Sequence, residues 1–211
     1  CFYRSSLQLP TKERTAFLLG NLANLGPPNS GTALLTQKVL ELNGINPDNS
    51  EIRHMAEAKA INELAKGSIE SMCIVDSYDS PNVQKLLNMD GLQLFNFSRA
   101  MAYSRRVPAL EKVVIPEGGL SLIKNWPQQP MTLVSATTEI LIDERLHPAI
   151  QTLFLMAASS INGKQSFFSD EGEFPSFKDT SQHRSHEAEV FYEKGSPWLM
   201  QFMPFWLAEF V

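Results

Sequence analysis

The sequence predicts a mixed α/β protein with a mainly parallel sheet. Between residues 19 and 97, short apolar runs alternate with segments of helical periodicity, in the order β-α-β-α-β-α-β. This alternation is typical of parallel sheets, because each helix returns the chain to the edge where the next strand begins. An apolar content of 43% and a charged content of 19% are those of an ordinary globular protein, and 211 residues suffice for one large domain or two small lobes.

Strands are predicted where apolar residues alternate with polar ones or form a short continuous run. In the alternating region we expect strands at residues 19–25, 51–55, 69–75 and 91–97, and outside it at 1–6, 112–116, 131–136 and 139–143. The run at 69–75 is almost wholly apolar, which suits a strand that is covered on both faces.

Helices are predicted from their spacing and from their capping residues. Ser30, Ser80 and Ser185 each precede a helical segment, and a serine hydroxyl accepts from the free N–H groups of a helix start. Gly67 and Asn162-Gly163 supply the residues that end helices. We expect helices at residues 31–43, 56–66, 82–88, 100–108, 149–161 and 186–194, with a last helical segment after Ser196-Pro197.

The loop from Leu25 to Thr32 is the leading candidate for a binding feature. Its helix start offers unpaired N–H groups and the positive end of the helix dipole, and Ser30 and Thr32 add hydroxyls, so it suits a carboxylate or a phosphate. From local sequence alone an ordinary capped helix after a loop is the favoured explanation, because anion sites are a minority of helix starts. A second loop, Asp76 to Asp79, follows a predicted strand, and ligands of parallel sheets usually lie outside the carboxyl ends of strands.

Several classes of function are disfavoured. The net charge is −5 and the basic residues form no cluster beyond Arg105-Arg106, so we expect no nucleic-acid binding. No apolar run reaches the roughly 18 residues of a membrane span. The sequence contains no G-x-S-x-G, Walker loop, GxGxxG or HExxH motif, so we expect no enzyme; the residual possibility is an acid–base site at which His54, Asp76 and Asp79 converge.

Metal and thiol chemistry are also disfavoured. Cys1 and Cys73 are too few for a disulfide framework and lack the spacing of a zinc site, and Cys73 lies in an apolar run where we expect an inert core residue. His183 and His186 are three residues apart but have no acidic or cysteine partner nearby, so we expect a solvated loop. We expect neither a metal nor a cofactor.

The C-terminal segment from Trp198 to Val211 is dense in aromatic and apolar side chains. Packing on the core of the domain explains this composition. An exposed segment that meets a partner or a membrane explains it as well, because large apolar patches mark interaction sites.

A set of short motifs, in order along nearly the whole chain, resembles the TAXI-family solute receptors of TRAP transporters. Pro27-Pro28-Asn29-Ser30-Gly31-Thr32 is similar to the family's GPxGSGT motif. The other similar stretches are Lys66–Ser71, Asp79–Gln84, Ala102–Arg106, Pro116–Gly119, Leu146–Ala149, Gly172–Ser176, Gly195–Leu199 and Pro204–Ala208. No single motif is decisive, whereas their order and spacing together are fairly specific.

The resemblance implies a periplasmic-binding-protein fold of type II, with two α/β lobes joined by a hinge. Residues 6–98 would form the inserted lobe, and residues 1–5 and 99–211 the remainder of the flanking lobe with the hinge crossings and C-terminal helices. Such receptors capture small carboxylates or amino acids and present them to TRAP membrane permease subunits. The expected location is the periplasm or the outer face of the inner membrane.

Within this scheme the ligand would meet three groups of residues. Asn29, Ser30, Gly31 and Thr32 would hold its anionic group through hydroxyls and backbone N–H groups. Asp76, Ser77 and Tyr78 would meet its polar or cationic parts. Thr137 and Thr138, near the second hinge crossing, are weaker candidates.

The chain departs from the family in two ways. Ala33 stands where the family usually has an arginine, which removes a charge from the candidate site. The segment that precedes Phe2 in family members is missing, so we expect an incomplete first lobe with exposed sheet edges that favour a homodimer. The alternative function is therefore a stand-alone sensor or protein-interaction domain of the same fold.

Overall fold

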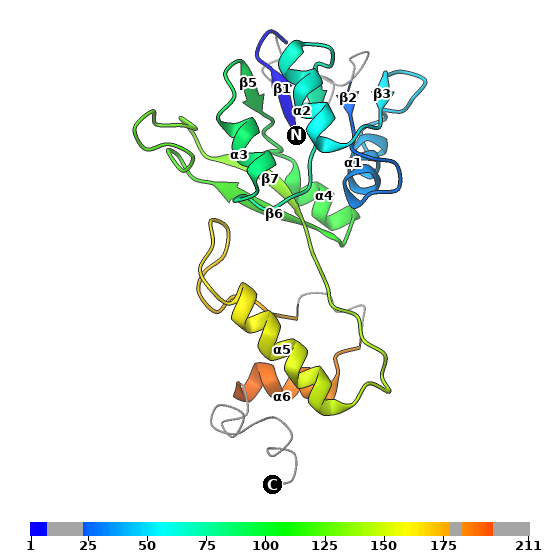
Figure 1. Cartoon of the computed structure of the whole chain (residues 1–211), viewed down its shortest axis with the longest axis vertical. Helices are drawn as coiled ribbons and strands as arrows, with labels where there is room; N and C mark the ends of the chain where they lie inside the picture. The colour runs from blue at the N-terminus through cyan, green and yellow to red at the C-terminus, as the bar shows by residue number, and fades with distance from the viewer. Residues whose placement is uncertain (8–22, 178–182, 196–211) are drawn as a thin grey trace. The chain divides into compact units, whose positions relative to one another are not determined.

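The computed structural model describes residues 1–7, 23–177 and 183–195. The chain divides into two compact units, unit 1 (Cys1–Thr137) and unit 2 (Thr138–Val211) (Figure 1). Unit 1 contains strands β1 (Phe2–Arg4), β2 (Ala23–Asn24), β3 (Ile52–Arg53), β4 (Ser71–Met72), β5 (Leu92–Leu94), β6 (Leu110–Ile115) and β7 (Met131–Ala136), with helices α1 (Gly31–Glu41), α2 (Glu57–Lys66), α3 (Pro81–Leu87) and α4 (Ala100–Arg106). Unit 2 contains helices α5 (Pro148–Asn162) and α6 (His186–Lys194).

The described part of unit 1 holds a mixed sheet with the strand order β3-β2-β4-β1-β5. Strand β2 pairs in parallel with both β3 and β4, and β1 pairs antiparallel with β4 and β5. The alternation of strands and helices from β2 to β5 confirms the predicted α/β class and the parallel arrangement at its centre. The first part of the strand expected at 19–25 lies outside the described residues.

Strand β1 lies inside this sheet rather than apart from it. Phe2 is opposite both Met72 and Leu94, so the chain's first strand joins β4 to β5. The expected lobe division had placed residues 1–5 with the flanking lobe. The structure gathers residues 1–137 in one unit, and the lobe boundaries of a complete receptor stay a prediction.

The predicted helix caps are confirmed. The Oγ atoms of Ser30, Ser80 and Ser185 accept from the backbone N–H groups of residues 33, 83 and 188 at 3.1–3.2 Å. Gly67 ends α2 with a φ of 81°, in the left-handed region that glycine adopts without strain. Local capping chemistry therefore sets these helix boundaries.

The core of unit 1 forms from buried residues of the sheet, of α1 and α2, and of α4, which packs on β6 and β7. Ile61 and Leu64 on α2 are 1% and 0% exposed, and Leu25 after β2 is equally buried. Strands β6 and β7 form a two-stranded antiparallel ribbon in register from Leu110 opposite Ala136 to Ile115 opposite Met131. Because Phe97 N donates to Thr132 O at 2.7 Å, the ribbon is tied to the segment that follows β5.

The regular secondary structure described in unit 2 consists of α5 and α6, which pack on each other. The strand predicted at 139–143 is wrong: these residues are irregular, and Ile140 and Leu141 are 61% and 74% exposed. An apolar run becomes a strand only where a neighbouring strand pairs with it, and none does here among the described residues. No helix in the described part of the chain has the length and apolarity to cross a membrane. The helical segment and apolar surface expected at 196–211 lie outside the described residues.

Candidate ligand site

The carboxyl ends of β2, β3 and β4 meet at one edge of the sheet because these strands are parallel. Backbone hydrogen bonds continue past the strand ends: Cys73 N donates to Asn24 O, and Leu25 N donates to Arg53 O, both at 3.0 Å. The connections that follow the three strands are therefore held side by side, which is where ligands of such sheets bind.

Asn24 holds two of these connections together. Its side chain is fully buried, its Oδ1 accepts from Met55 N at 2.7 Å, and its Nδ2 lies 3.5 Å from Met55 O. Sequence reasoning missed this positioning residue. The available signal was a polar side chain inside an apolar run, which is favourable only if the buried amide is hydrogen-bonded.

The loop before α1 turns sharply and then packs back on the helix. Ser30 N donates to Pro27 O at 3.2 Å, with Pro28 and Asn29 between them and Asn29 at a φ of 60°, the pattern of a type II turn. Gly26 has a φ of 88°, and a Cβ built there would lie 3.0 Å from Thr32 Cγ2. Glycine is therefore required where the loop passes Thr32.

The start of α1 leaves donors free for an anion. Ser30 Oγ accepts from Ala33 N at 3.1 Å and donates to Pro27 O at 2.7 Å. Among the described residues the N–H groups of Gly31 and Thr32 have no hydrogen-bond acceptor, and a Cβ on Gly31 would meet no atom within 4 Å. The helix start therefore has two N–H groups without a described acceptor, at the positive end of the helix dipole, and the space beside Gly31 is open.

Thr32 joins the two loops that the sequence singled out. Its side chain is 6% exposed, and its Oγ1 accepts from Val75 N at 3.3 Å. This bond fixes the start of α1 against the segment that leads from β4 to Asp76. The expectation that the two loops lie together at the sheet edge is thus met, although the hydroxyl of Thr32 serves the fold and leaves its N–H for a ligand.

The Asp76–Tyr78 loop is exposed and locally ordered. Asp76 Oδ1 accepts from Ser77 N at 2.8 Å, and Tyr78 O accepts from Gln84 Nε2 of α3 at 2.8 Å. Asp76 and Ser77 are exposed, so they face solvent beside the edge. They offer a carboxylate and a hydroxyl to the polar part of a ligand.

The remaining candidates are less closely linked to the helix start. Thr137 N donates to Ala109 O at 3.0 Å, which extends the β6–β7 ribbon by one pair. Thr138 opens unit 2 and is exposed, so it is not placed relative to α1. Ala33 is 4% exposed, so this position packs into the core of unit 1 instead of carrying a charge.

Of the three residues of the possible acid–base site, His54, Asp76 and Asp79, the first two make separate contacts. His54 Nδ1 lies 3.1 Å from Gly26 O, and no hydrogen bond joins His54, Asp76 and Asp79. In the described parts of the chain no three His, Cys, Asp or Glu side chains are grouped to hold a metal ion. Near His183 and His186, the Arg184 guanidinium stacks on the Phe177 ring, 4.2 Å from its centroid, and burial raises the pKa of Tyr192.

The expectation for Cys73 as an inert free core residue is wrong. Cys73 is buried as expected, but it forms a disulfide with Cys1. The two residues are 72 positions apart, and they meet because β1 pairs with β4. Only this pairing, which the sequence did not reveal, brings the thiols together.

Comparison with known proteins gives a limited likeness. The sequence matches no protein-family model. Among solved structures, the chain is similar in part to the periplasmic aliphatic sulphonate binding protein SsuA from Escherichia coli, with a TM-score of 0.37 and 14% sequence identity. The match covers 51% of this chain and 38% of that chain, so it spans well under two thirds of the solved protein.

Proposed function

We propose that unit 1 is a solute-binding lobe of a TRAP-type receptor and that it binds a small carboxylate or amino acid without catalysing a reaction. The observation that carries the proposal is the start of α1, where the N–H groups of Gly31 and Thr32 have no acceptor among the described residues and a Cβ on Gly31 would meet open space. The hydrogen bond between Thr32 Oγ1 and Val75 N holds this helix start at the carboxyl edge of the sheet.

The groups at the carboxyl edge of the sheet suit a zwitterion, a ligand with both a carboxylate and an ammonium group. The two N–H groups and the helix dipole stabilise a carboxylate, and a helix start of this kind is a ready anion site. The exposed Asp76 carboxylate, on the neighbouring loop, offers a partner for an ammonium group. Selectivity between acids and amino acids would then depend on Asp76, whereas basal affinity would depend on the helix start.

The Cys1–Cys73 disulfide supports a location in the periplasm, because disulfides persist in oxidising compartments and are rare in the cytosol. In the proposed role the receptor passes its solute to TRAP permease subunits. The homodimer expected from exposed sheet edges stays a prediction.

The test is calorimetric titration of the full chain with glutamate, succinate and aliphatic acids and amino acids. We expect at least one acid to bind, and Ser30→Ala to weaken it about tenfold, because the loss of a cap frays the helix start. Ser80→Ala, the matched cap on α3, should leave the affinity unchanged. The proposal fails if no acid binds, or if Ser30→Ala and Ser80→Ala affect binding equally.

A second candidate is a protein-interaction domain, and one observation in unit 2 favours it. Helix α5 exposes an apolar stripe at helical spacing, in which Ile150, Leu153, Phe154 and Ile161 are 41%, 39%, 48% and 75% exposed. Exposed apolar stripes of this kind mark interaction surfaces. Light scattering after size-exclusion chromatography tests it: a dimer that Phe154→Glu converts to a monomer supports this candidate, and a monomeric wild-type chain opposes a homodimer.

A further inference from the structure

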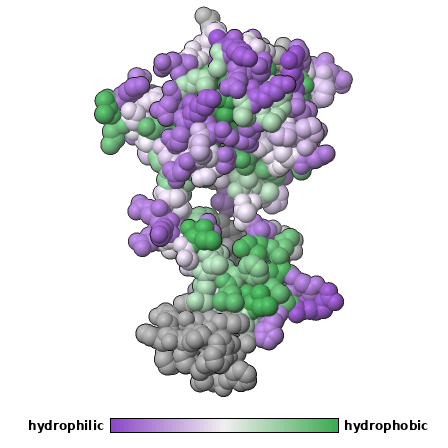
Figure 2. All heavy atoms as spheres, viewed as in Figure 1, coloured by the Kyte–Doolittle hydropathy of each residue, from purple (hydrophilic) through white to green (hydrophobic). Residues whose placement is uncertain are grey.

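The ribbon tip, residues 118–130 between β6 and β7, projects from the rest of unit 1 (Figure 1). It carries the two most exposed large apolar side chains in the described part of the chain, Leu122 at 88% and Ile123 at 100%. Figure 2 shows strongly apolar atoms at the left edge of unit 1, where this connection lies in the same view. Because the two side chains are adjacent and lie wholly in water, they form a small apolar patch, and such patches mark interaction sites.

The backbone that carries this pair is an ordered turn. Trp126 N donates to Ser121 O at 2.9 Å and Ser121 N donates to Trp126 O at 3.0 Å, so these two residues close a hairpin loop. Inside the loop, Asn125 N donates to Leu122 O at 3.3 Å, and Asn125 Nδ2 donates to Glu117 Oε1 at 2.8 Å. The apolar pair is therefore presented in one place, and little conformational freedom is lost when it meets a surface.

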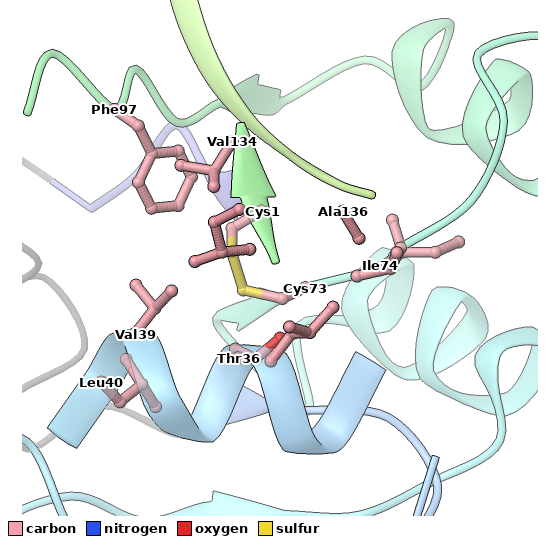
Figure 3. A pocket seen from close by; sticks show the side chains of 12 residues that line it. Cys1, Thr36, Val39, Leu40, Cys73, Ile74, Phe97, Val134 and Ala136 are labelled. Carbon is pink, nitrogen blue, oxygen red and sulfur yellow. A yellow bond between two sulfur atoms is a disulfide. The ribbon is translucent and has the colours of Figure 1, made fainter. Parts of the chain in front are cut away.

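The other end of the ribbon is anchored in unit 1. Figure 3 shows Val134 and Ala136 of β7 facing α1 and the Cys1–Cys73 disulfide across a half-open cavity of about 60 Å³. Leu110 of β6 lines the same cavity and is 4% exposed. Since β6 and β7 pair in register along their whole length, the ribbon tip is held at the end opposite to these buried residues.

The charge of the ribbon tip suits an anionic surface. Lys124 is the one charged residue in the sequence from 118 to 130, although the whole chain has a net charge of −5. Its side chain is exposed and forms no ion pair with another described residue. Its ammonium group is thus available to an anionic lipid, which attracts basic side chains close to the surface. Trp126, half-buried at the base of the loop, is of a residue type that favours the membrane interface.

A lipid bilayer fits the ribbon tip better than a protein pocket does. A protein partner would need a concave site that matches this convex loop and excludes water from it. A bilayer surface accepts apolar side chains without such a match, and it adds phosphate groups for a neighbouring lysine.

We propose that the ribbon tip docks this protein on the surface of an anionic lipid bilayer, with Leu122 and Ile123 inserted among the lipid chains and Lys124 bound to lipid phosphate. The contact is shallow and reversible, because two side chains bury far less apolar surface than a spanning helix does. The inference is independent of the solute site proposed above.

The experiment is co-sedimentation of the full chain with vesicles of phosphatidylcholine and with vesicles of equal parts phosphatidylcholine and phosphatidylglycerol. We expect binding to the mixed vesicles, and the double variant Leu122→Ser, Ile123→Ser should weaken it at least about tenfold, because each apolar side chain that leaves water adds to the affinity. Lys124→Gln should weaken binding to the mixed vesicles about fivefold and leave binding to phosphatidylcholine unchanged, since its charge acts on anionic lipid only.

Ile161→Ser is the matched control. Ile161 lies on α5 in unit 2 and is 75% exposed, so this variant removes an exposed isoleucine without altering the ribbon. It should bind vesicles as the wild type does. The amide NMR spectra of all variants should match that of the wild type away from the substituted residues, because none of these side chains is buried.

Loss of vesicle binding in the double serine variant, with binding retained in Ile161→Ser, supports the proposal. It is overturned if the wild-type chain sediments with neither vesicle, if the double variant binds as the wild type does, or if Ile161→Ser weakens binding equally. A wild-type dimer that dissociates in the double variant, without sedimentation with vesicles, would assign the ribbon tip to a second copy of the chain and also overturn the proposal. None of these results alters the test of the solute site, which is read from titration with acids and amino acids.

Discussion

The two units bury their apolar helix faces to very different extents. In unit 1, Ile61 and Leu64 of α2 are almost completely buried, whereas in unit 2, Leu153 and Phe154 of α5 are more than a third exposed. Figure 2 shows an apolar area on the unit that holds α5 and α6. Both helices have apolar residues at helical spacing, so this spacing identifies which face is apolar but not what covers it.

Unit 1 also combines more stabilising features than the described part of unit 2. Its sheet, its helix-covered core and its disulfide act together, whereas the described part of unit 2 has two helices and irregular segments. The candidate ligand site also lies in unit 1, where the hydrogen bond from Val75 N to Thr32 Oγ1 holds the helix start. The following predictions test this contrast, from the largest expected effect to the smallest.

Loss of the disulfide should give the largest effect, and it should be confined to unit 1. Closing a loop of 72 residues removes conformational entropy from the unfolded chain, so Cys73→Ser should lower the free energy of unfolding of unit 1 by about 4 kcal/mol. Hydrogen exchange measured by mass spectrometry should show faster exchange in peptides of unit 1 only. Equal acceleration in α5 and α6, or none in either unit, would contradict this prediction.

Matched leucine substitutions should separate the two helix faces. Leu64→Ala leaves a cavity in a fully buried site and should lower the free energy of unfolding by about 2–5 kcal/mol. Leu153→Ala, at 39% exposure, should cost less than about 1 kcal/mol, since less surface leaves contact. Urea denaturation of each variant measures the difference, and similar costs would mean that α5 is covered in solution.

Matched cap substitutions should instead act alike in both units. Ser80→Ala in α3 and Ser185→Ala in α6 each remove one hydroxyl that accepts from a helix N–H, at 3.2 Å in both cases. Each should cost about 1 kcal/mol locally, because capping depends on the helix end and not on the surrounding core. Amide exchange in the first turn of each helix reports the effect. A cost confined to α3 would show that the cap in unit 2 is not formed.

Tyr3 should give the smallest effect, and only at high pH. Burial raises the pKa of Tyr3, whose hydroxyl donates to Gln93 Oε1 at 2.6 Å between β1 and β5. Because the pKa of Tyr3 is higher in the folded state than in the unfolded state, its contribution to the free energy of unfolding is fully present below the unfolded pKa of about 10. This contribution is lost as the pH rises through the folded pKa. Unfolding of unit 1, followed between pH 9 and 12, should show this loss, and Tyr3→Phe should abolish it. If Tyr3→Phe kept the pH profile of the wild type, the loss of stability at high pH could not be assigned to Tyr3.

The sequence predicted those features that depend on neighbouring residues. The caps at Ser30 and Ser80, the glycine at position 67 and the alternation of strands and helices are all local, and each is confirmed. The loop before α1 was also identified as a candidate site from its own residues. Its link to the Asp76 loop followed from the parallel arrangement of the sheet.

The features that the sequence did not reveal join distant residues. The place of β1 between β4 and β5, the Cys1–Cys73 disulfide and the amide of Asn24 across to Met55 depend on pairings that leave no local pattern. The strand expected at 139–143 failed for the same reason, since a strand needs a partner. The cavity beside α1 is of this kind too, because its walls come from both ends of unit 1.

The central claim, that the start of α1 binds a carboxylate, is tested most directly by an NMR titration of the ¹⁵N-labelled full chain with 4-methylpentanoate. The account predicts saturable shifts of the amide signals of Gly31 and Thr32, with little change at Asn82 and Glu187 near the starts of α3 and α6. Equal small shifts at all three helix starts, or an unchanged Gly31 signal while ligand binds elsewhere, would contradict it.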